Sequence, residues 1–528
     1  MLLTVTVFLP LAAALLGLLL PGDDPRLARR YGLCVSLATF AVSLALPAAF
    51  DAVSGAMQLE ASAPWIRNFG IAYHVGVDGL SLFLVLLTTL LVPICLLSAE
   101  RAIDRKVKEF VIAMLVLETG MLGAFVALDL FLFFVFWEVM LVPMYLLIGI
   151  WGGERREYAA IKFVLYTMVG SVLMLIAILY LHIAHLRVTG ERSFELAAFQ
   201  ALVLPPRAQL LCFLAFALAF AIKVPMFPLH TWLPDAHVQA PTAGSVILAG
   251  VLLKLGTYGL MRFALPLFPR AAVECGPYLG ALAVVGILYG ALVALDQRDL
   301  KRLVAYSSVS HLGFVVLGLG ALTVRGLEGA VFQMLTHGLS TGALFLAVGV
   351  IYERRHTREI SQLGGLFREM PVFGAFLLIA TLASAGLPGL AGFVGEFLIL
   401  LGTFEAPRLL LGHPKLYAAL AAGGVVLGAW YLLVMYQKTM LGPVSNPKNR
   451  GLPDLSTRER AVFLPILALI FVMGIYPTPI LRRIEPAAQR WLGEFHTKYE
   501  ASLRLGPGDA PIVIGRDKAG EDRVGNTP

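Results

Sequence analysis

The chain has 528 residues, of which 59% are hydrophobic and 14% are charged. Soluble domains typically carry about 25% charged residues, so this composition, with a mean hydropathy of +0.82, excludes an ordinary soluble protein and predicts one built for the lipid bilayer. The formal net charge of +7 does not indicate a nucleic-acid partner, because Lys and Arg held in the cytoplasmic loops of a membrane protein give the same excess.

The sequence predicts an all-α, polytopic membrane protein of about 14 transmembrane helices, each close to the roughly 20 apolar residues that cross a bilayer. The predicted spans cover residues 2–20, 31–50, 78–98, 110–127, 129–151, 159–186, 208–230, 240–263, 278–295, 300–320, 327–352, 372–404, 414–440 and 460–477. We group them into N-terminal helices (1–100), two five-helix units (110–263 and 278–440) and a last helix (460–477). Residues 478–528 are expected to form a C-terminal tail, poorly ordered beyond about residue 505.

Lys and Arg concentrate in alternate loops between the predicted spans. The basic loops include Arg101, Arg105, Lys106 and Lys108, then Arg298, Lys301 and Arg302, then Arg354, Arg355, Arg358 and Arg368. Because cytoplasmic loops carry this excess, we predict a multi-pass protein of the bacterial inner (plasma) membrane. An even number of spans places both the N- and C-termini on the periplasmic side.

Two predicted spans are interrupted. Pro225 and Pro228 break the seventh span just after Lys223. A Gly- and Pro-rich run from Ala385 to Gly392 breaks the twelfth. Proline removes a backbone donor and clashes with the preceding turn, so the freed backbone groups need other partners at membrane depth. Interruptions at matching places in two halves are typical of repeats around a transport path, and we expect the two five-helix units to be inverted copies.

Glu138 lies in the string 131–140, near the middle of the otherwise apolar span 129–151. A charge at mid-helix costs roughly 2.5–3.5 kcal/mol on insertion scales, so we expect a partner from another helix. Lys223 is the natural candidate, because it is a single opposite charge at a helix break. The pair has two interpretations: a static structural ion pair, or a pair in which Glu138 tunes the release of a proton from Lys223.

Lys254 lies deep in the eighth predicted span, with no acid within two turns of it. Tyr258, at i+4, is its one strong polar neighbour on that face. Snorkelling of the ammonium to the surface is the alternative, but the ten residues on either side are mostly apolar. Because burial disfavours the charged form of a lysine, we predict that Lys254 exchanges protons.

His311 and His337 lie inside spans beside small hydroxyl residues. Histidine titrates near neutrality and relays protons by either ring nitrogen, although a lone buried histidine is often only a satisfied polar group. Their place in line with two lysines favours a relay. Glu396 follows the break of the twelfth span and is the predicted acid at the far end of this row of buried ionisable residues. Glu118 is a possible supporting acid.

The proline-rich loop 228–241 follows the break in the seventh predicted span. His230, Asp235 and His237 offer metal ligands there, but rigid turns explain the three prolines without a metal. The four cysteines lie far apart and form no CxxC pair, and the sequence has no P-loop, haem motif or GxGxxG after a strand. We therefore expect no metal and no redox cofactor in this chain.

Several long strings of this sequence resemble one known family. They are residues 223–225, the loop 228–241, residues 252–259, residues 134–143 around Glu138 and residues 392–396 ending on Glu396. The chain is similar to the antiporter-like subunits of respiratory complex I, NADH-quinone oxidoreductase, and among them to the M type (mitochondrial subunit 4 type). The resemblance covers nearly all of residues 75–475, and strings of this length are highly specific.

The resemblance implies a fourteen-helix, proton-translocating subunit of the membrane arm of that enzyme. In the family, the positions of Glu138 and Lys223 form a paired site. The position of Lys254 is the central proton carrier, and those of His311 and His337 lie on the connecting polar axis.

The resemblance also implies partners. The acid at Glu396 marks the M type, because the sister L and N types look to carry a lysine there, and L-type and N-type subunits are the expected neighbours. NADH, flavin, iron–sulfur clusters and quinone belong to other subunits, so this chain contributes to the translocating enzyme without a redox centre of its own.

Other functions stay open on the sequence. A subunit of a multi-subunit Na⁺/H⁺ antiporter or of a membrane-bound hydrogenase has similar chemistry, although Glu396 and residues 252–259 favour complex I. A structural membrane spacer needs no proton carrier at Lys254. A glycosyl- or lipid-handling enzyme is disfavoured, because no paired catalytic carboxylates occur in a predicted aqueous loop. Sodium in place of a proton also stays open at Lys223.

Overall fold

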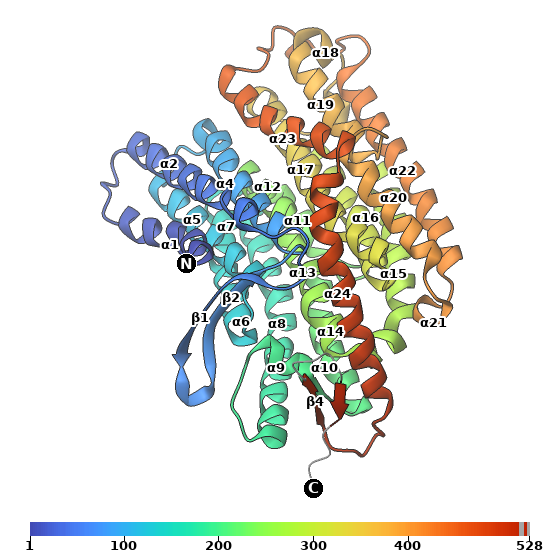
Figure 1. Ribbon diagram of the computed structural model, residues 1–528. Helices are drawn as coiled ribbons and strands as arrows, with labels where there is room; N and C mark the ends of the chain where they lie inside the picture. The colour runs from blue at the N-terminus through green and yellow to red at the C-terminus, as the bar shows by residue number, and fades with distance from the viewer. Residues whose placement is uncertain (517–521, 525–528) are drawn as a thin grey trace.

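The computed structural model describes residues 1–516 and 522–524. Its N-terminal region comprises α1 (Leu2–Gly17), α2 (Pro25–Ser43), the short α3 (Leu46–Ala49) and an antiparallel hairpin of β1 (Gln58–Ile66) and β2 (Ile71–Val77), joined by the 3-10 turn η1 (Arg67–Phe69). The hairpin projects from one end of the helical bundle (Figure 1). We call this end of the molecule the hairpin end.

The first half of the bundle follows the hairpin. It comprises α4 (Leu82–Ala102), α5 (Val107–Val126), α6 (Leu130–Val139), α7 (Leu141–Trp151), α8 (Arg156–Thr189), α9 (Leu196–Ala201), the short strand β3 (Leu202–Val203) and α10 (Pro206–Lys223). Asp129 caps α6 by accepting two hydrogen bonds from backbone N–H groups of the first turn, as short polar side chains do at helix N-termini. α10 ends at Lys223, which confirms the first predicted break, because Pro225 and Pro228 cannot continue the helical hydrogen bonding.

The helix that carries Lys254 runs from Thr242 to Leu267 and is not uniformly α-helical. After α11 (Trp232–Gln239) come α12 (Thr242–Ile247), a π-helical segment η2 (Leu248–Leu252), α13 (Leu253–Gly259), a second π-helical segment η3 (Leu260–Ala264) and α14 (Leu265–Leu267). π-helical segments are rare and occur frequently at functional sites. Here the two segments flank the turn that holds Lys254.

The second half of the bundle has longer helices. It comprises α15 (Pro269–Leu295), α16 (Leu300–Gly320), α17 (Val324–Arg355), η4 (Ile360–Gln362), α18 (Leu366–Glu369), α19 (Pro371–Ser384), α20 (Ala391–Glu405), α21 (Arg408–Leu411), α22 (Pro414–Met440), η5 (Pro447–Asn449) and α23 (Thr457–Ile475). The gap between α19 and α20 confirms the second predicted break. Gly386 and Gly389 adopt φ values of +74° and +90° there, a backbone conformation that glycine adopts without steric cost.

The number of membrane spans differs from the prediction. By length and composition, 11 of the described helices can cross a membrane, or up to 12 if α23 and the helix after it, bent by 69°, form one span. Hydropathy predicts about 14 because it does not register breaks. α1 is only 16 residues long, and the twelfth predicted span is divided into α19, of 14 residues, and α20, of 15 residues.

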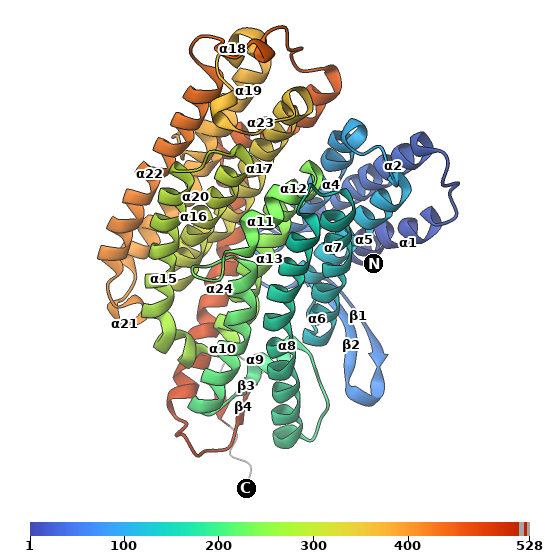
Figure 2. The ribbon, with the colours of Figure 1, turned by 180° about the vertical axis from the view of Figure 1, so that it is seen from behind.

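The expected C-terminal tail is largely structured. α24 (Thr478–Leu503) crosses the face of the bundle that is in front in Figure 1, whereas α8, α10, α15 and α22 are prominent in the view from behind (Figure 2). β4 (Ile512–Arg516) then pairs with β3 and with β5 (Asp522–Val524). The expectation of poor order beyond residue 505 is therefore wrong for these strands, because Ile512 and Ile514 pack on buried Val203. Residues 517–521 and 525–528 lie outside the described residues.

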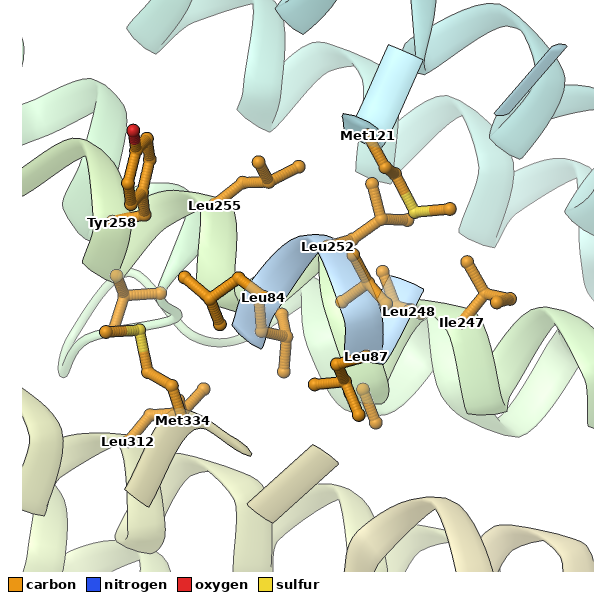
Figure 3. Packing of buried hydrophobic residues seen from close by; sticks show 14 of the residues in the cluster. Leu84, Leu87, Met121, Ile247, Leu248, Leu252, Leu255, Tyr258, Leu312 and Met334 are labelled. Carbon is orange, nitrogen blue, oxygen red and sulfur yellow. The ribbon is translucent and has the colours of Figure 1, made fainter. Parts of the chain in front are cut away.

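The interior of the bundle is built around the Lys254 helix. Figure 3 shows side chains of α4 (Leu84, Leu87), α5 (Met121), α16 (Leu312) and α17 (Met334) gathered about it. Among the described spans, the apolar 18-residue stretches of this helix and of α17 are entirely buried inside the protein, whereas only 39% of the corresponding stretch of α8 is buried. Polar side chains on these two central helices are therefore surrounded by protein and not by lipid or bulk water.

Candidate functional site

Lys254 is fully buried on α13, and its ammonium has two partners. It donates a hydrogen bond to the carbonyl of Ala249, in the preceding π-helical segment. Its Nζ lies 2.6 Å from Nδ1 of His337 on α17. Tyr258, the neighbour expected from helical spacing, turns elsewhere and donates its hydroxyl proton to the carbonyl of Phe125. Helical spacing thus predicts that Lys254 and Tyr258 lie on the same face of the helix. It does not predict the direction in which either long side chain points.

The row continues from His337 through His311 to Glu396. The ring centroids of His337 and His311, on α17 and α16, are 5.7 Å apart. Nδ1 of His311 lies 2.9 Å from Oε1 of Glu396 on α20, and all of these side chains are buried. The structure therefore brings together four of the residues predicted from sequence: Lys254, His337, His311 and Glu396.

Side chains from two further positions support the end of this row. The Nε2 of Gln333, on α17, donates a hydrogen bond of 3.1 Å to Oε1 of Glu396. The hydroxyl of Tyr431, on α22, donates to Ser307 over 2.7 Å and lies 3.5 Å from Nε2 of His311. The carboxylate of Glu396 therefore has two polar neighbours from other helices, His311 on α16 and Gln333 on α17. These contacts offset part of the cost of burying the carboxylate.

Glycines permit the close approach of α17 and α20 on which this contact depends. A Cβ atom added to Gly395 would lie 2.9 Å from Cα of Gln333, and one added to Gly329 would lie 2.7 Å from the backbone nitrogen of Ile399. The two backbones are therefore in direct contact here. Because Glu396 is the next residue after Gly395, this contact places its carboxylate within reach of α16 and α17.

Glu138 and Lys223 form a second cluster. Nζ of the fully buried Lys223 lies 5.1 Å from the ring centroid of Trp137 and 5.4 Å from that of Phe163, which is the geometry of cation–π contacts. Glu138, the neighbour of Trp137 in sequence, acts electrostatically on Lys223. Among the described residues, neither Nζ of Lys223 nor Oε1 of Glu138 has a hydrogen-bond partner. The two charges therefore interact without direct contact.

Comparison with known proteins shows the family to which the chain is similar. Residues 127–413 match the family described as NADH:quinone oxidoreductase/Mrp antiporter, transmembrane. Subunit M of NADH-quinone oxidoreductase from Rhodobacter capsulatus is 46% identical to this chain, over 94% of the chain and 97% of that subunit. Chain 4 of NADH-ubiquinone oxidoreductase from Arabidopsis thaliana is 42% identical, over 93% and 97%. A chain of respiratory complex I from Thermus thermophilus superposes with a TM-score of 0.84 at 35% identity, covering 94% of this chain and all of that one.

The chain belongs to the M-subunit family of NADH-quinone oxidoreductase, respiratory complex I. It is a multi-pass, antiporter-like, proton-translocating subunit of the membrane arm of that enzyme. Of the assignments that the sequence left open, the M subunit is therefore favoured over an antiporter or hydrogenase subunit, because the match to M subunits extends over nearly the whole chain.

The M-subunit family is a family of membrane subunits and not of redox-centre subunits. The predicted loop 228–241 is wrong for most of its length, because residues 232–239 form α11, and the candidate metal ligands there have other neighbours. His230 packs against aromatic rings, Asp235 binds Lys162 over 2.7 Å, and His237 stacks on Phe345 with ring centroids 4.5 Å apart. No group of three or more His, Cys, Asp or Glu side chains suited to a metal ion occurs in residues 1–516 and 522–524.

Two buried groups of this M subunit stand outside the row. Glu118 on α5 is fully buried, and neither of its carboxylate oxygens has a partner in the described part of the chain. The same holds for both ring nitrogens of His237. The sequence singled out Glu118 as a supporting acid and His237 only as a possible metal ligand, and the contacts bring neither into the row.

Sequence reasoning missed two functional neighbours. Gln333 lies at i−4 from His337, so the helical spacing of polar residues on α17 was a usable signal. Tyr431 had no such signal, because nothing near it in sequence is ionisable and its partners come from a helix more than 100 residues away.

Proposed function

We propose that the chain carries protons along the row Lys254, His337, His311 and Glu396. The observation that supports this most directly is the contact of 2.6 Å between Nζ of Lys254 and Nδ1 of His337. A lysine and a histidine in contact exchange a proton without a change in backbone structure. The ring centroids of His337 and His311 are 5.7 Å apart, which is the spacing of neighbouring rings in contact, and His311 contacts Glu396 directly.

The Glu138–Lys223 cluster has a different proposed role. Because Nζ of Lys223 has no hydrogen-bond partner among the described residues, the ammonium is stabilised mainly by Glu138 and by the faces of two aromatic rings. A change in the charge of Glu138 or in its distance then changes how readily Lys223 releases its proton. We assign this cluster to tuning and the row that begins at Lys254 to transfer.

The architecture supports a transport path between two related units. We infer that residues 110–263 and 278–440 are inverted five-helix repeats, because each contains a helix broken at membrane depth, after Lys223 and after Ser384. With the shorter α1, the broken pair α19–α20 and α23 counted as crossings, the chain has about 14 spans. Residues 1–100 and 478–528 then flank the repeats.

The setting of the subunit follows from its family and its charges. We infer a place in the bacterial inner (plasma) membrane, with both termini on the periplasmic side, as the distribution of Lys and Arg indicates. The lipid bilayer, L-type and N-type antiporter-like subunits are its proposed neighbours. NADH, flavin, iron–sulfur clusters and quinone are assigned to other subunits, so the energy for translocation comes from their chemistry.

The test replaces Lys254 in the assembled complex. In inside-out membrane vesicles, Lys254→Ala is expected to abolish NADH-driven acidification while the complex still assembles. Lys254→Arg keeps the positive charge but does not release its proton, and it is expected to fail as well. Lys415→Ala, which removes an exposed lysine, is the control and is expected to pump normally.

The outcomes separate the remaining alternatives. Normal pumping by Lys254→Ala contradicts the relay and supports a structural spacer. Full pumping by Lys254→Arg contradicts a step in which Lys254 loses its proton. Uptake of labelled sodium in place of acidification would show that the cation moved is sodium.

A further inference from the structure

A cavity of about 250 Å³ opens at the hairpin end, between the β-hairpin, α9 and α24. Its lining includes the exposed side chains of Glu60 and Arg490, so solvent reaches it. His74 and Glu195 line its wall. At this end of the molecule the cavity brings water toward the helix that carries Lys254.

Arg262 and Asp78 lie at the buried side of this cavity. Each side chain is only 5% exposed, and Nη2 of Arg262 lies 2.6 Å from Oδ1 of Asp78. The same carboxylate oxygen also accepts hydrogen bonds from the backbone N–H groups of Leu80 and Ser81. Asp78 is thus fixed by its own loop, and it holds the guanidinium in place.

Tyr258 lies between this ion pair and Lys254 on the same helix. Nε of Arg262 donates to the Tyr258 hydroxyl over 3.1 Å, and that hydroxyl donates to the carbonyl of Phe125 over 2.8 Å. Lys254, Tyr258 and Arg262 follow one another at intervals of four residues, so Arg262 lies about 12 Å from Lys254 along the axis. A polar side chain is therefore present at each turn between the cavity and the proton carrier.

The hydrogen bonds of Tyr258 to Phe125 and Arg262 disfavour proton conduction along this line of polar groups, although the hydroxyl of Ser81 is also a neighbour of Tyr258. Its only proton is committed to a backbone carbonyl, and its oxygen accepts from a guanidinium, which does not give up its proton in proteins. Apolar side chains, among them Leu84 and Leu255, line this stretch of the helix (Figure 3). A water molecule needs several polar partners to occupy such a place.

We propose that Arg262, held by Asp78 and bonded to Tyr258, closes the hairpin end of the Lys254 helix against protons from the cavity. A fixed positive charge opposes the approach of a proton. A carrier open to the cavity while it exchanges protons with His337 would return protons across the membrane without work. This proposal rests on the proposed role of Lys254, because a closure matters only where a proton carrier lies behind it.

The test measures passive proton leak. In vesicles containing the assembled complex, a preset pH gradient is followed without NADH. The double variant Asp78→Asn, Arg262→Gln removes both charges together, so no unpaired charge stays buried. We expect the gradient to decay severalfold faster than with the unchanged complex. A decay as slow as that of the unchanged complex would overturn the proposal.

Two further variants make the assignment specific. Asp78→Asn alone keeps the guanidinium and is expected to stay proton-tight; a leak as fast as that of the double variant would contradict a barrier made by Arg262. The control is Arg325→Gln with Glu405→Gln, which removes an exposed ion pair at the same end of the molecule. It is expected to leave the decay unchanged, and a leak there would show an unspecific effect of lost ion pairs and count against the proposal.

Assembly of the double variant is not required for a decision. Arg262→Lys keeps an ion pair with Asp78 but introduces a cation that can release its proton, so a faster decay is expected, and a tight vesicle would overturn the closure. Lys254→Ala separates the carrier role of Lys254 from the closure by Arg262. Loss of pumping in proton-tight vesicles supports the carrier role. Normal pumping contradicts the carrier role, whatever leak the Arg262 variants show. If Arg262 instead belonged to an exit route, its variants would lose pumping without leaking.

Discussion

Nζ of Lys254 lies 2.6 Å from Nδ1 of His337, across the contact between α13 and α17. A charged ammonium only donates, so Nδ1 accepts while Lys254 is charged, and the ring proton of a neutral His337 is then on Nε2. Nε2 has no partner in the described part of the molecule. The charged Lys254 thus selects the tautomer of His337 that carries its proton on Nε2, where the N–H is free for the next group. A neutral Lys254 also permits the tautomer that carries the proton on Nδ1.

This tautomer argument predicts the effect of His337→Gln. Glutamine fills a similar space and accepts a hydrogen bond from Lys254, but it does not exchange protons between two positions. We expect the complex to assemble and the rate of NADH-driven acidification to fall by about 100-fold, the lower range for loss of a positioned proton-transfer group. Vesicle acidification measured against NADH oxidation gives the result.

A matched histidine provides the control for that substitution. His182→Gln removes a ring that contacts the carbonyl of Ser193 and stacks on Phe194, away from the row. Pumping is expected to stay normal. Normal pumping by His337→Gln would show that protons pass Lys254 by another route.

Glu138 acts on Lys223 through its charge and not through a direct hydrogen bond. This predicts different pumping rates for two conservative variants of Glu138. Glu138→Asp keeps the charge but changes its distance from Lys223 by the length of one methylene group, so it is expected to lower the pumping rate less than loss of the charge does; no hydrogen bond between the two residues is lost in either variant. Glu138→Gln keeps the shape but removes the charge and is expected to reduce pumping strongly. Glu109→Gln, at an exposed position in the first turn of α5, is the control. Equal activity of the Asp and Gln variants would exclude electrostatic tuning.

The sequence indicated which residues gather at the candidate site better than which of them are in contact. Lys254, His311 and His337 were identifiable because ionisable residues within apolar spans are rare and usually functional. Which of them are in direct contact was not accessible, because the contact of Lys254 with His337 joins residues 83 positions apart. The breaks at Lys223 and Ser384 were predicted because Pro and Gly act locally.

Where the prediction was wrong, tertiary packing was the reason. Tyr258 was expected beside Lys254, but Phe125 and Arg262 offered it better partners. Gln333 was overlooked, although Glu396 depends on it for a hydrogen bond. Hydropathy overestimated the number of long spans because it averages over breaks. The order of the C-terminal segment depends on the pairing of β4 with β3, for example of Val513 with Leu202, and no local pattern shows a pairing between such distant residues.

The contact of α17 with α20 predicts opposite effects for two Gly→Ala changes. At Gly395, a Cβ atom would lie 2.9 Å from Cα of Gln333, so α20 must move away and Glu396 loses its contact with His311. We expect a lower thermal stability, by the roughly 1–3 kcal/mol of an overpacked core, and reduced pumping. Gly423, on α22, has open space around it, and alanine there is expected to be neutral or to stabilise by about 0.5–1 kcal/mol. Unchanged pumping by Gly395→Ala would contradict the need for this contact.

His74, on the β-hairpin outside the membrane spans, predicts a pH dependence of the hairpin end. Its ring nitrogens lie 3.0 Å from Glu195 and 3.0 Å from Glu60. The hydrogen bond to Glu195 raises the pKa of His74 above its ordinary value of 6.5, burial opposes this, and Glu60 adds to it. A group whose pKa is raised by folding stabilises the folded state fully below its unfolded pKa, and this stabilisation is lost as the pH rises through the folded pKa.

We therefore expect the hairpin to open more readily as the pH rises from below 6.5 through the raised pKa of His74. Hydrogen–deuterium exchange of residues 58–77, corrected for the intrinsic pH dependence of exchange, measures this opening. His74→Gln is expected to remove the pH dependence, because glutamine has no charge to lose. His496→Gln, at an exposed position of α24, is expected to retain it. A hairpin that becomes more protected as the pH rises would contradict a charged His74 held between the two glutamates.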